Sequence, residues 1–358
     1  MKQVLVSYTI NVHFTRSQIE ELGINQLTPQ QLERAHNALN GFAEEFGKPW
    51  VEQIFGPSRA SSTVLCIVSA WEDWRLVKVL HGSNEIKQRW TEGFNKHGVS
   101  AEVQVVAALL WEQATVELAP QIDGRVPDFR FKKDSTWVYC EVSERGISKV
   151  RQRASEILQK LADGAATAVQ GRFGKLAVLT EVNDDEVQEI LSWLTRIGTP
   201  HETRLRDIAV FYADELTIPI SENDLIERLV PKPRLMCVHI SDPVGVGKLL
   251  GAASLPLLDD AARRILEQEA GQLPRDEPNL VFLDVSSVIG GDEVWPPLIR
   301  RSFQPTINTR ISGVVVFSSV LDSCGRNTKW SFLSNSYARR PIPESELQVV
   351  QRIAGQSN

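Results

Sequence analysis

Two acidic residues on neighbouring predicted strands are the first candidates for chemistry in this sequence. Asp128 lies in the run VPDFRFK, and Glu141 lies in WVYCEVS, two residues before Ser143. Side chains alternate between the two faces of a strand, so Glu141 and Ser143 share one face. A hairpin formed by these two strands would bring Asp128 and Glu141 together on one face of a sheet.

A pair of carboxylates held side by side suits a hard divalent cation. Their negative charges repel each other, and Mg²⁺ or Mn²⁺ offsets this repulsion because these ions take oxygen ligands. Such an ion leaves positions open for water and phosphate, lowers the pKa of its bound water and neutralises charge that grows on a phosphate. The pair therefore indicates a Mg²⁺ or Mn²⁺ site suited to phosphodiester hydrolysis.

Glu102 is a third candidate metal ligand, on a predicted helix over residues 101–113. Steps of three and four residues from it reach Val105, Val106 and Leu109, which places Glu102 on the apolar, core-facing stripe of the helix. An unpaired carboxylate in that position would be costly. We expect Glu102 to assist the metal directly or through water.

The order of elements around these residues resembles the PD-(D/E)XK nuclease superfamily. The sequence predicts a helix, a strand, a strand with Pro127-Asp128, a strand with Glu141-x-Ser143, and then a helix and a strand. The resemblance implies an α/β protein with a restriction-endonuclease-like mixed sheet flanked by helices. It also implies a metal-dependent nuclease acting on DNA, in a defence or mobile-element context, with Asp128, Glu141 and Glu102 at the metal.

Ser143 departs from the superfamily pattern, which has a lysine at this catalytic position. Serine is neutral and too short to position water or to offset negative charge as lysine does. In the nuclease hypothesis, Gln272 of the helix AARRILEQEAGQL, or a nearby basic side chain, orients the nucleophile. The basic residues that could replace the lysine are Arg130, Lys132, Arg145 and Lys149.

Basic residues just past the Glu141 strand are the predicted contacts to the DNA backbone, and a solvated helix start is the alternative interpretation of the same run. They are Arg145, Lys149, Arg151 and Arg153. The missing lysine leaves a second function open, that of a catalytically inactive nuclease-fold protein serving as a nucleic-acid-binding or assembly subunit.

Strand and helix signals divide the chain into three parts. The boundaries are an N-terminal α/β region (1–96), a PD-(D/E)XK-like domain (97–320) with an α/β insertion (148–256), and a C-terminal extension (321–358). The first part includes a possible strand at 3–12 and the apolar run TVLCIVSA. Either of two helix–strand pairs could close the core fold, one at 148–182 and the other at 258–288, and the sequence leaves this choice open.

Composition excludes several classes of protein. The chain has 358 residues, 42% of them hydrophobic and 23% charged, which excludes disorder and collagen. No run is long and apolar enough for a membrane helix and no signal peptide is visible, so we expect a cytoplasmic protein without a membrane partner. The net charge of −6 argues against non-specific coating of DNA, so DNA binding needs a local patch. A homodimer or a larger complex stays open.

A third hypothesis is nucleotide binding by the glycine-rich run DPVGVGK. A Walker A loop needs a glycine five positions before the Gly-Lys pair and a Ser or Thr after it, but these positions hold Asp242 and Leu249. Gly245, Gly247 and Gly251 also fail to match a dinucleotide fingerprint. A regulator that binds ATP or NAD would use the residues from Gly245 to Lys248.

Overall fold

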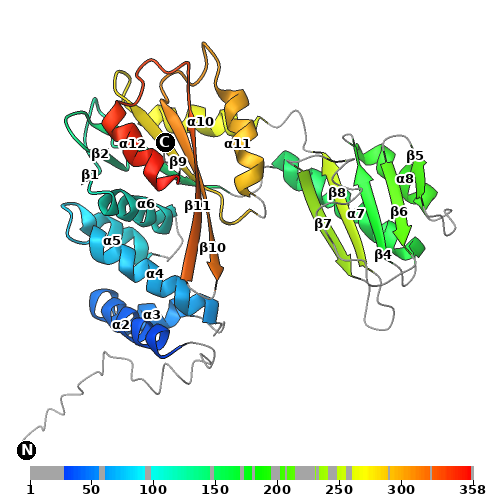
Figure 1. Ribbon diagram of the computed structural model, residues 1–358, viewed down its shortest axis with the longest axis horizontal. Coiled ribbons are helices and arrows are strands. Elements are labelled where there is room, and N and C mark those ends of the chain that lie inside the picture. The colour runs from blue at the N-terminus through cyan, green and yellow to red at the C-terminus, as the bar shows by residue number, and fades with distance from the viewer. Residues whose placement is uncertain are drawn as a thin grey trace, which may run out of the picture. The chain divides into compact units, whose positions relative to one another are not determined.

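The computed structural model divides the chain into two compact units (Figure 1). Unit 1 comprises Met1–Arg145, Arg263–Asp292 and Ile299–Asn358, and unit 2 comprises Gly146–Ala262 and Glu293–Leu298. The structure describes residues 28–55, 61–92, 98–145, 149–169, 173–179, 182–194, 202–205, 208–213, 230, 234–240, 248–254, 260–288, 291–322 and 325–355. The predicted strand at 3–12 and most of the glycine-rich run, 241–247, lie outside these residues.

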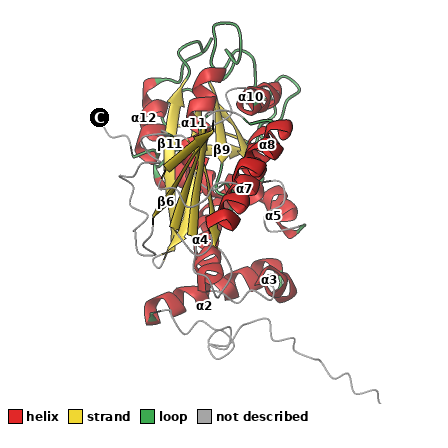
Figure 2. Cartoon of the chain, turned by 90° about the vertical axis from the view of Figure 1, so that its right-hand side faces the viewer, coloured by secondary structure: helices red, strands yellow, loops and turns green. Residues whose placement is uncertain are grey.

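Helices alone make up the described elements of residues 28–92, where the sequence favoured an α/β region. They are α2 (Pro29–Phe46), α3 (Lys48–Phe55), α4 (Ser61–Val77) and α5 (Ser83–Thr91). The apolar run TVLCIVSA lies inside α4, because its apolar positions continue at helical spacing to the buried Trp74 and Val77. Helices α2 and α3 lie at one end of unit 1, below α4 in both Figure 1 and Figure 2.

Unit 1 is built on a mixed six-stranded sheet, ordered β1-β2-β3-β9-β10-β11. Strand β2 runs antiparallel to both of its neighbours, β1 and β3. Strands β3, β9 and β10 are parallel, and β11 returns antiparallel to β10. The strands are β1 (Thr115–Leu118), β2 (Phe129–Lys132), β3 (Val138–Glu144), β9 (Asn279–Asp284), β10 (Gly313–Asp322) and β11 (Gly325–Ser334). The expectation of an α/β protein with a mixed sheet flanked by helices is confirmed.

Helices cover the sheet and supply its core. One face packs in a single apolar cluster with α6 (Val99–Trp111), through side chains such as Phe129 and Cys140 of the sheet and Val105 and Leu109 of the helix. Helices α4 and α12 (Glu344–Ile353) contact the same sheet at β11. Helix α10 (Ala261–Gln272) contributes Glu269, which meets Ser143 on the opposite face of β3.

The C-terminal residues belong to the sheet of unit 1. Strand β11 pairs with β10 over ten positions, from Gly313 with Ser334 to Asp322 with Gly325. The expected boundary at 320/321 therefore falls inside a β-hairpin. Its apolar face explains the pairing, since Phe317 stacks on Trp330 with ring centroids 4.5 Å apart.

Two helix–strand pairs were candidates to close the core fold. The strand of the pair α10–β9 lies next to β3 in the sheet of unit 1. The other pair, α7 (Lys149–Val169) and β4 (Phe173–Val178), belongs to unit 2, with α8 (Asp184–Leu194). Unit 2 has a separate five-stranded sheet, ordered β5-β6-β4-β8-β7. Its other strands are β5 (Glu202–Leu205), β6 (Ile208–Ala213), β7 (Arg234–Ile240) and β8 (Lys248–Ser254). Helix α11 (Gly291–Ser302) leads from β9 towards β10.

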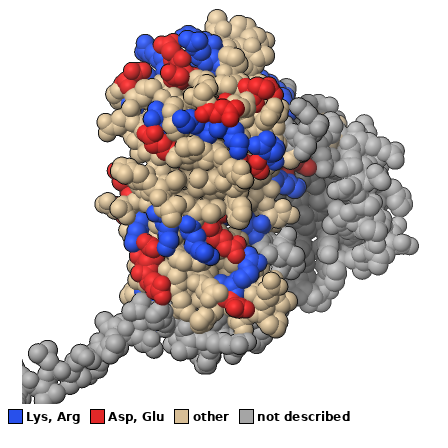
Figure 3. Space-filling model, turned by 60° about the vertical axis from the view of Figure 1, so that its left-hand side comes forward, with Lys and Arg blue, Asp and Glu red and all other residues tan. Residues whose placement is uncertain are grey.

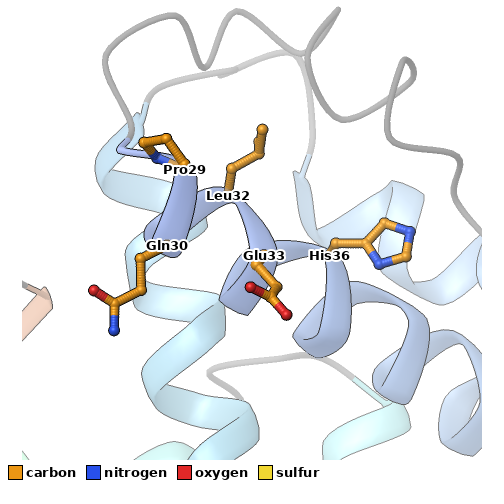
Figure 4. A pocket seen from close by; sticks show the side chains of 5 residues that line it. All are labelled: Pro29, Gln30, Leu32, Glu33 and His36. Carbon is orange, nitrogen blue, oxygen red and sulfur yellow. The ribbon is translucent and has the colours of Figure 1, made fainter.

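A pocket of about 540 Å³ lies against the first turns of α2, away from the sheet (Figure 4). It is lined by Pro29, Gln30, Leu32, Glu33 and His36.

None of the helices that the structure describes has the length and apolarity needed to cross a membrane.

Candidate active site

Asp128 and Glu141 face each other across the β2–β3 hairpin. The register pairs Phe129 with Cys140, so one further step places Asp128 opposite Glu141. The Val142 N–H donates to Asp128 Oδ2 over 2.8 Å, which fixes the carboxyl group against β3. The structure thus brings together the two residues that the sequence singled out.

The Glu141 carboxyl group is deeply buried. Its side chain belongs to a residue that is 3% exposed, and its Oε1 atom has no hydrogen-bond partner among the described residues. A buried carboxylate oxygen without a partner costs free energy, and such positions concentrate at functional sites. This oxygen is a free acceptor for a cation.

Glu102 reaches the same site from the first turn of α6, where the sequence placed it on the core-facing stripe. Gly98, with φ of 71°, adopts the left-handed conformation that begins this helix. Glu102 is 2% exposed, and Arg89 Nη2 of α5 donates to Glu102 Oε1 over 2.9 Å and to Oε2 over 2.6 Å. Arg89 therefore engages both oxygens that were predicted to assist the metal.

Glu269 of α10 is a fourth carboxyl group of this site; it is 3% exposed and contacts both Ser143 and Arg145. The Ser143 hydroxyl donates to Glu269 Oε1 over 2.8 Å. Arg145 Nη2 donates to the same oxygen over 2.5 Å and to Ser143 Oγ over 2.6 Å. On the exposed side, Gln272 Nε2 donates to Glu269 Oε2 over 3.4 Å. A cation thus stands beside Ser143, supplied by Arg145.

Mutual repulsion and burial raise the pKa values of these carboxyl groups. Burial raises the pKa of Glu141 to about 10, and the charges of Asp128, Glu269 and Glu102 add to it. Burial and the charge of Asp128 raise the pKa of Glu102 to about 8, against the opposing effect of Arg89. Burial also raises the pKa of Asp128, although the Val142 N–H and Arg89 favour its ionised form.

A hydrogen bond between the carboxyl groups of Asp128 and Glu141 lowers the pKa of Asp128 and raises that of Glu141. At neutral pH the pair therefore holds one proton, which resides on Glu141. A divalent cation would have to displace this proton, because metal ligands bind in their deprotonated form.

The residues fit a cation held by two carboxylates. Asp128 and Glu141 offer adjacent oxygens, and Mg²⁺ commonly binds through one or two carboxylates together with water and substrate phosphate. Among the described residues, no three or more His, Cys, Asp or Glu side chains converge as a metal-binding group. Arg89 binds Glu102 and Arg145 binds Glu269, whereas Asp128 and Glu141 have no arginine or lysine partner among the described residues.

The predicted DNA contacts are divided between the two units, with Arg145 in unit 1 and the other three residues in unit 2. Arg145 is an inner residue of the carboxylate site and is paired with Glu269. Arg151 is 0% exposed and its guanidinium lies 4.4 Å from the ring centroid of Trp295, so it is not on the surface where a phosphate could reach it. Lys149 and Arg153 are exposed on α7 of unit 2, and Arg153 pairs with Glu156 over 3.3 Å.

The other proposed substitutes for the lysine also have partners outside the site. Arg130 donates to Glu117 Oε2 over 2.7 Å and stacks on Trp137, with its guanidinium carbon 4.4 Å from the ring centroid. Lys132 lies over the same ring at 4.7 Å. The contacts of both side chains therefore lie within the hairpin formed by β1, β2 and β3, with Glu117, Trp137 and Tyr139.

Sequence reasoning missed Glu269 and Arg89. Glu269 carried a usable signal, because it follows Leu266 by three residues and precedes Leu273 by four, a helical spacing that predicts a shared buried face. The same argument had identified Glu102. Arg89 carried no signal, since nothing in its sequence neighbourhood distinguishes it from other surface arginines.

Comparison of the chain with protein-family models, curated proteins and solved structures finds no match.

Proposed function

We propose that this protein is a metal-dependent phosphodiesterase that cleaves DNA, built on a restriction-endonuclease-like sheet. The observation that carries the proposal is the pairing of Asp128 with Glu141, where a buried Glu141 Oε1 lacks a hydrogen-bond partner among the described residues. A buried carboxyl group that faces a second carboxyl group, both with raised pKa values, is costly to maintain, so this arrangement favours a functional explanation over a structural one.

The order of elements supports the same proposal. Helix α6, strands β1, β2 and β3, helix α10 and strand β9 follow one another in unit 1 once the segment assigned to unit 2 is set aside. This is the order that the resemblance to PD-(D/E)XK nucleases implies. The Asp128 strand and the Glu141 strand are adjacent in the sheet, as that resemblance requires.

The proposed roles follow from the contacts. Asp128 and Glu141 would hold Mg²⁺ or Mn²⁺, which when bound supplies an activated water and offsets charge on the phosphate. Arg145 brings positive charge to the Ser143 position, where the superfamily has a lysine, and Glu269 positions both side chains. Gln272 stands at the exposed rim and is placed to orient water. Arg89 keeps Glu102 in place behind the pair.

Substitution of the two paired carboxylates tests the proposal. We expect Asp128→Asn and Glu141→Gln each to abolish cleavage of plasmid and linear DNA in Mg²⁺ or Mn²⁺, and to remove Mn²⁺ binding in a calorimetric titration. The matched control is Glu85→Gln, an exposed carboxylate on α5. Circular dichroism should show all variants folded. Metal-dependent cleavage by either site variant would contradict the proposal.

A second function is favoured by one observation, the ion pairing of Glu102 and Glu269 with arginines. These ion pairs neutralise two of the four carboxyl groups without a metal. Such an arrangement suits a site whose charges contribute to stability and not to catalysis. The alternative is an inactive nuclease-fold subunit that binds nucleic acid. It predicts DNA binding in EDTA, no specific Mn²⁺ site and no effect of Asp128→Asn on binding, whereas the enzyme predicts a site that Asp128→Asn abolishes.

A further inference from the structure

Four arginines gather around the C-terminal end of α10, outside the candidate active site. Arg125 Nε donates to the Gly271 carbonyl over 3.0 Å, and Arg310 Nη1 donates to the neighbouring Ala270 carbonyl. These bonds anchor two guanidinium groups on the last turn of the helix. The arginine cluster consists of Arg125, Arg275, Arg310 and Arg339.

Backbone contacts place the other two arginines beside Arg310. Asn279 Nδ2 donates to the Pro274 carbonyl over 2.8 Å and to the Arg310 carbonyl over 3.0 Å, so the loop with Arg275 is tied to that with Arg310. The Arg339 N–H donates to the Thr309 carbonyl over 2.7 Å.

The loops that carry Arg275, Arg310 and Arg339 lie at one edge of the sheet. They enter the parallel strands β9 and β10 and leave the antiparallel strand β11. At the upper end of unit 1, where these loops lie in Figure 1, Figure 3 shows Lys and Arg side chains at the surface among Asp and Glu side chains. Arg125 belongs to the loop between β1 and β2, and it joins the cluster through its bond to the Gly271 carbonyl at the end of α10.

The cluster holds four positive charges close together. Burial lowers the pKa of the Arg310 guanidinium, and the charges of Arg125, Arg275 and Arg339 lower it further, with Asp276 acting in the opposite sense. Within the described residues, none of these arginines forms an ion pair with a carboxylate. Like charges held together repel, so a surface of this kind is suited to a polyanion.

Capping of α10 explains only part of the arrangement. Basic side chains stabilise helix C-termini through the last carbonyls, and Arg125 and Arg310 do so. Each uses one N–H group on α10, although a guanidinium has five. Arg275 and Arg339 are exposed and donate no side-chain hydrogen bond within the described residues. These two side chains have no capping role.

The cluster adjoins the carboxylate site through one helical turn. Glu269 and Gln272 belong to the site, and the carbonyls of the two residues between them, Ala270 and Gly271, hold the arginines. One turn of helix rises about 5.4 Å. A phosphate chain lying on the arginines would therefore pass directly beside the site.

We propose that the arginine cluster binds the sugar–phosphate backbone of a nucleic acid and guides it to the carboxylate site. The identification of this nucleic acid as a substrate rests on the proposed function, whereas its binding to the cluster does not. Arginine suits the role because its planar donors match phosphate oxygens in pairs. In this proposal the cluster contacts the phosphate backbone, a role that the sequence assigned to the run from Arg145 to Arg153.

The test measures DNA binding without cleavage. The double variant Arg275→Ala/Arg339→Ala removes the two arginines without a structural bond, and its matched control, Arg75→Ala/Lys329→Ala, removes two exposed charges elsewhere in unit 1. Binding of a fluorescent DNA duplex is followed by anisotropy in EDTA over a series of NaCl concentrations. We expect the site variant to bind about tenfold more weakly or worse, with a salt slope reduced by about two, one for each lost phosphate contact. The control should match the wild type.

Equal affinity and equal salt slope for the site variant and the wild type would overturn the proposal. Wild-type binding to phosphatidylserine vesicles but not to DNA would also overturn it, by identifying an anionic membrane as the partner. The proposed nuclease function fails separately. Salt-dependent DNA binding through the cluster without any metal-dependent cleavage would contradict the enzyme alone, and Asp128-dependent cleavage that the double variant retains in full would contradict the cluster alone.

Discussion

At the scale of single residues, the Asp128–Glu141 pair lowers the stability of the folded chain when both carboxyl groups are ionised. Glu141 is buried beside three other carboxyl groups, and its pKa of about 10 records how strongly its environment disfavours the charge. In the unfolded chain the same group ionises near its ordinary value, which is about 4.3. Folding in the absence of a metal therefore requires Glu141 to take up a proton at neutral pH.

The stability of the protein should report this proton uptake. The raised pKa means that the folded state binds more protons than the unfolded state between about pH 4 and pH 10, so the contribution of Glu141 to stability falls as pH rises through that window. The slope reaches about 1.4 kcal/mol per pH unit. We expect Glu141→Gln to remove this part of the pH dependence, measured by urea unfolding from pH 5 to pH 9 in EDTA.

Glu85→Gln is the control for the pH experiment, because Glu85 is exposed and its removal should leave the pH dependence unchanged. A Glu141→Gln curve parallel to that of the wild type would show that Glu141 is ionised in the folded protein.

At the scale of elements, α10 connects the carboxylate site with the arginine cluster. Leu266 of the helix and Leu273, directly after its last residue, are fully buried on either side of Glu269, so apolar packing docks this end of the helix. This docking sets the position of the carboxylate that binds Ser143 and Arg145. The geometry of the site therefore depends on apolar packing as well as on charge.

Truncation of Leu266 should weaken this docking. Leu266 is fully buried, and removal of its side chain to Ala creates a cavity that costs about 2–5 kcal/mol of unfolding free energy. Glu267→Ala is the matched control because Glu267 is its exposed neighbour, and we expect a change within about 0.5 kcal/mol. Urea unfolding measures both, and a Leu266→Ala variant as stable as the control would show that α10 is not anchored through this residue.

At the scale of the whole molecule, the chain forms two units with separate cores. Leu109 is fully buried in the core of unit 1 and Leu161 in that of unit 2. The main segment of unit 2, Gly146–Ala262, lies in sequence between two parts of the carboxylate site. The site itself is made of residues from unit 1.

Separate cores predict separate unfolding. We expect scanning calorimetry to resolve two transitions. Leu161→Ala should lower the midpoint temperature of one and Leu109→Ala that of the other, because each substitution costs its unit about 2–5 kcal/mol of unfolding free energy. A single transition lowered equally by both substitutions would show that the two units unfold as one cooperative body.

The sequence alone predicted the parts of this protein that depend on local periodicity. Strand alternation placed Asp128 and Glu141 on one face, and helix periodicity placed Glu102 towards the core; the structure shows both. Composition and alternation also predicted the α/β class. The same local signals were ambiguous for TVLCIVSA, because an apolar run suits a buried strand or a buried helix equally well.

Only the tertiary structure decided which charges meet. Arg89 and Glu269 enter the site from α5 and α10, and Arg145 turns back onto Ser143. The four arginines of the cluster come from four loops spread over more than two hundred residues of the sequence. Contacts between distant residues depend on which strands and helices pack together, and no periodicity within one segment records that. The sequence thus determined the two facing carboxylates, and the fold determined the cations that surround them.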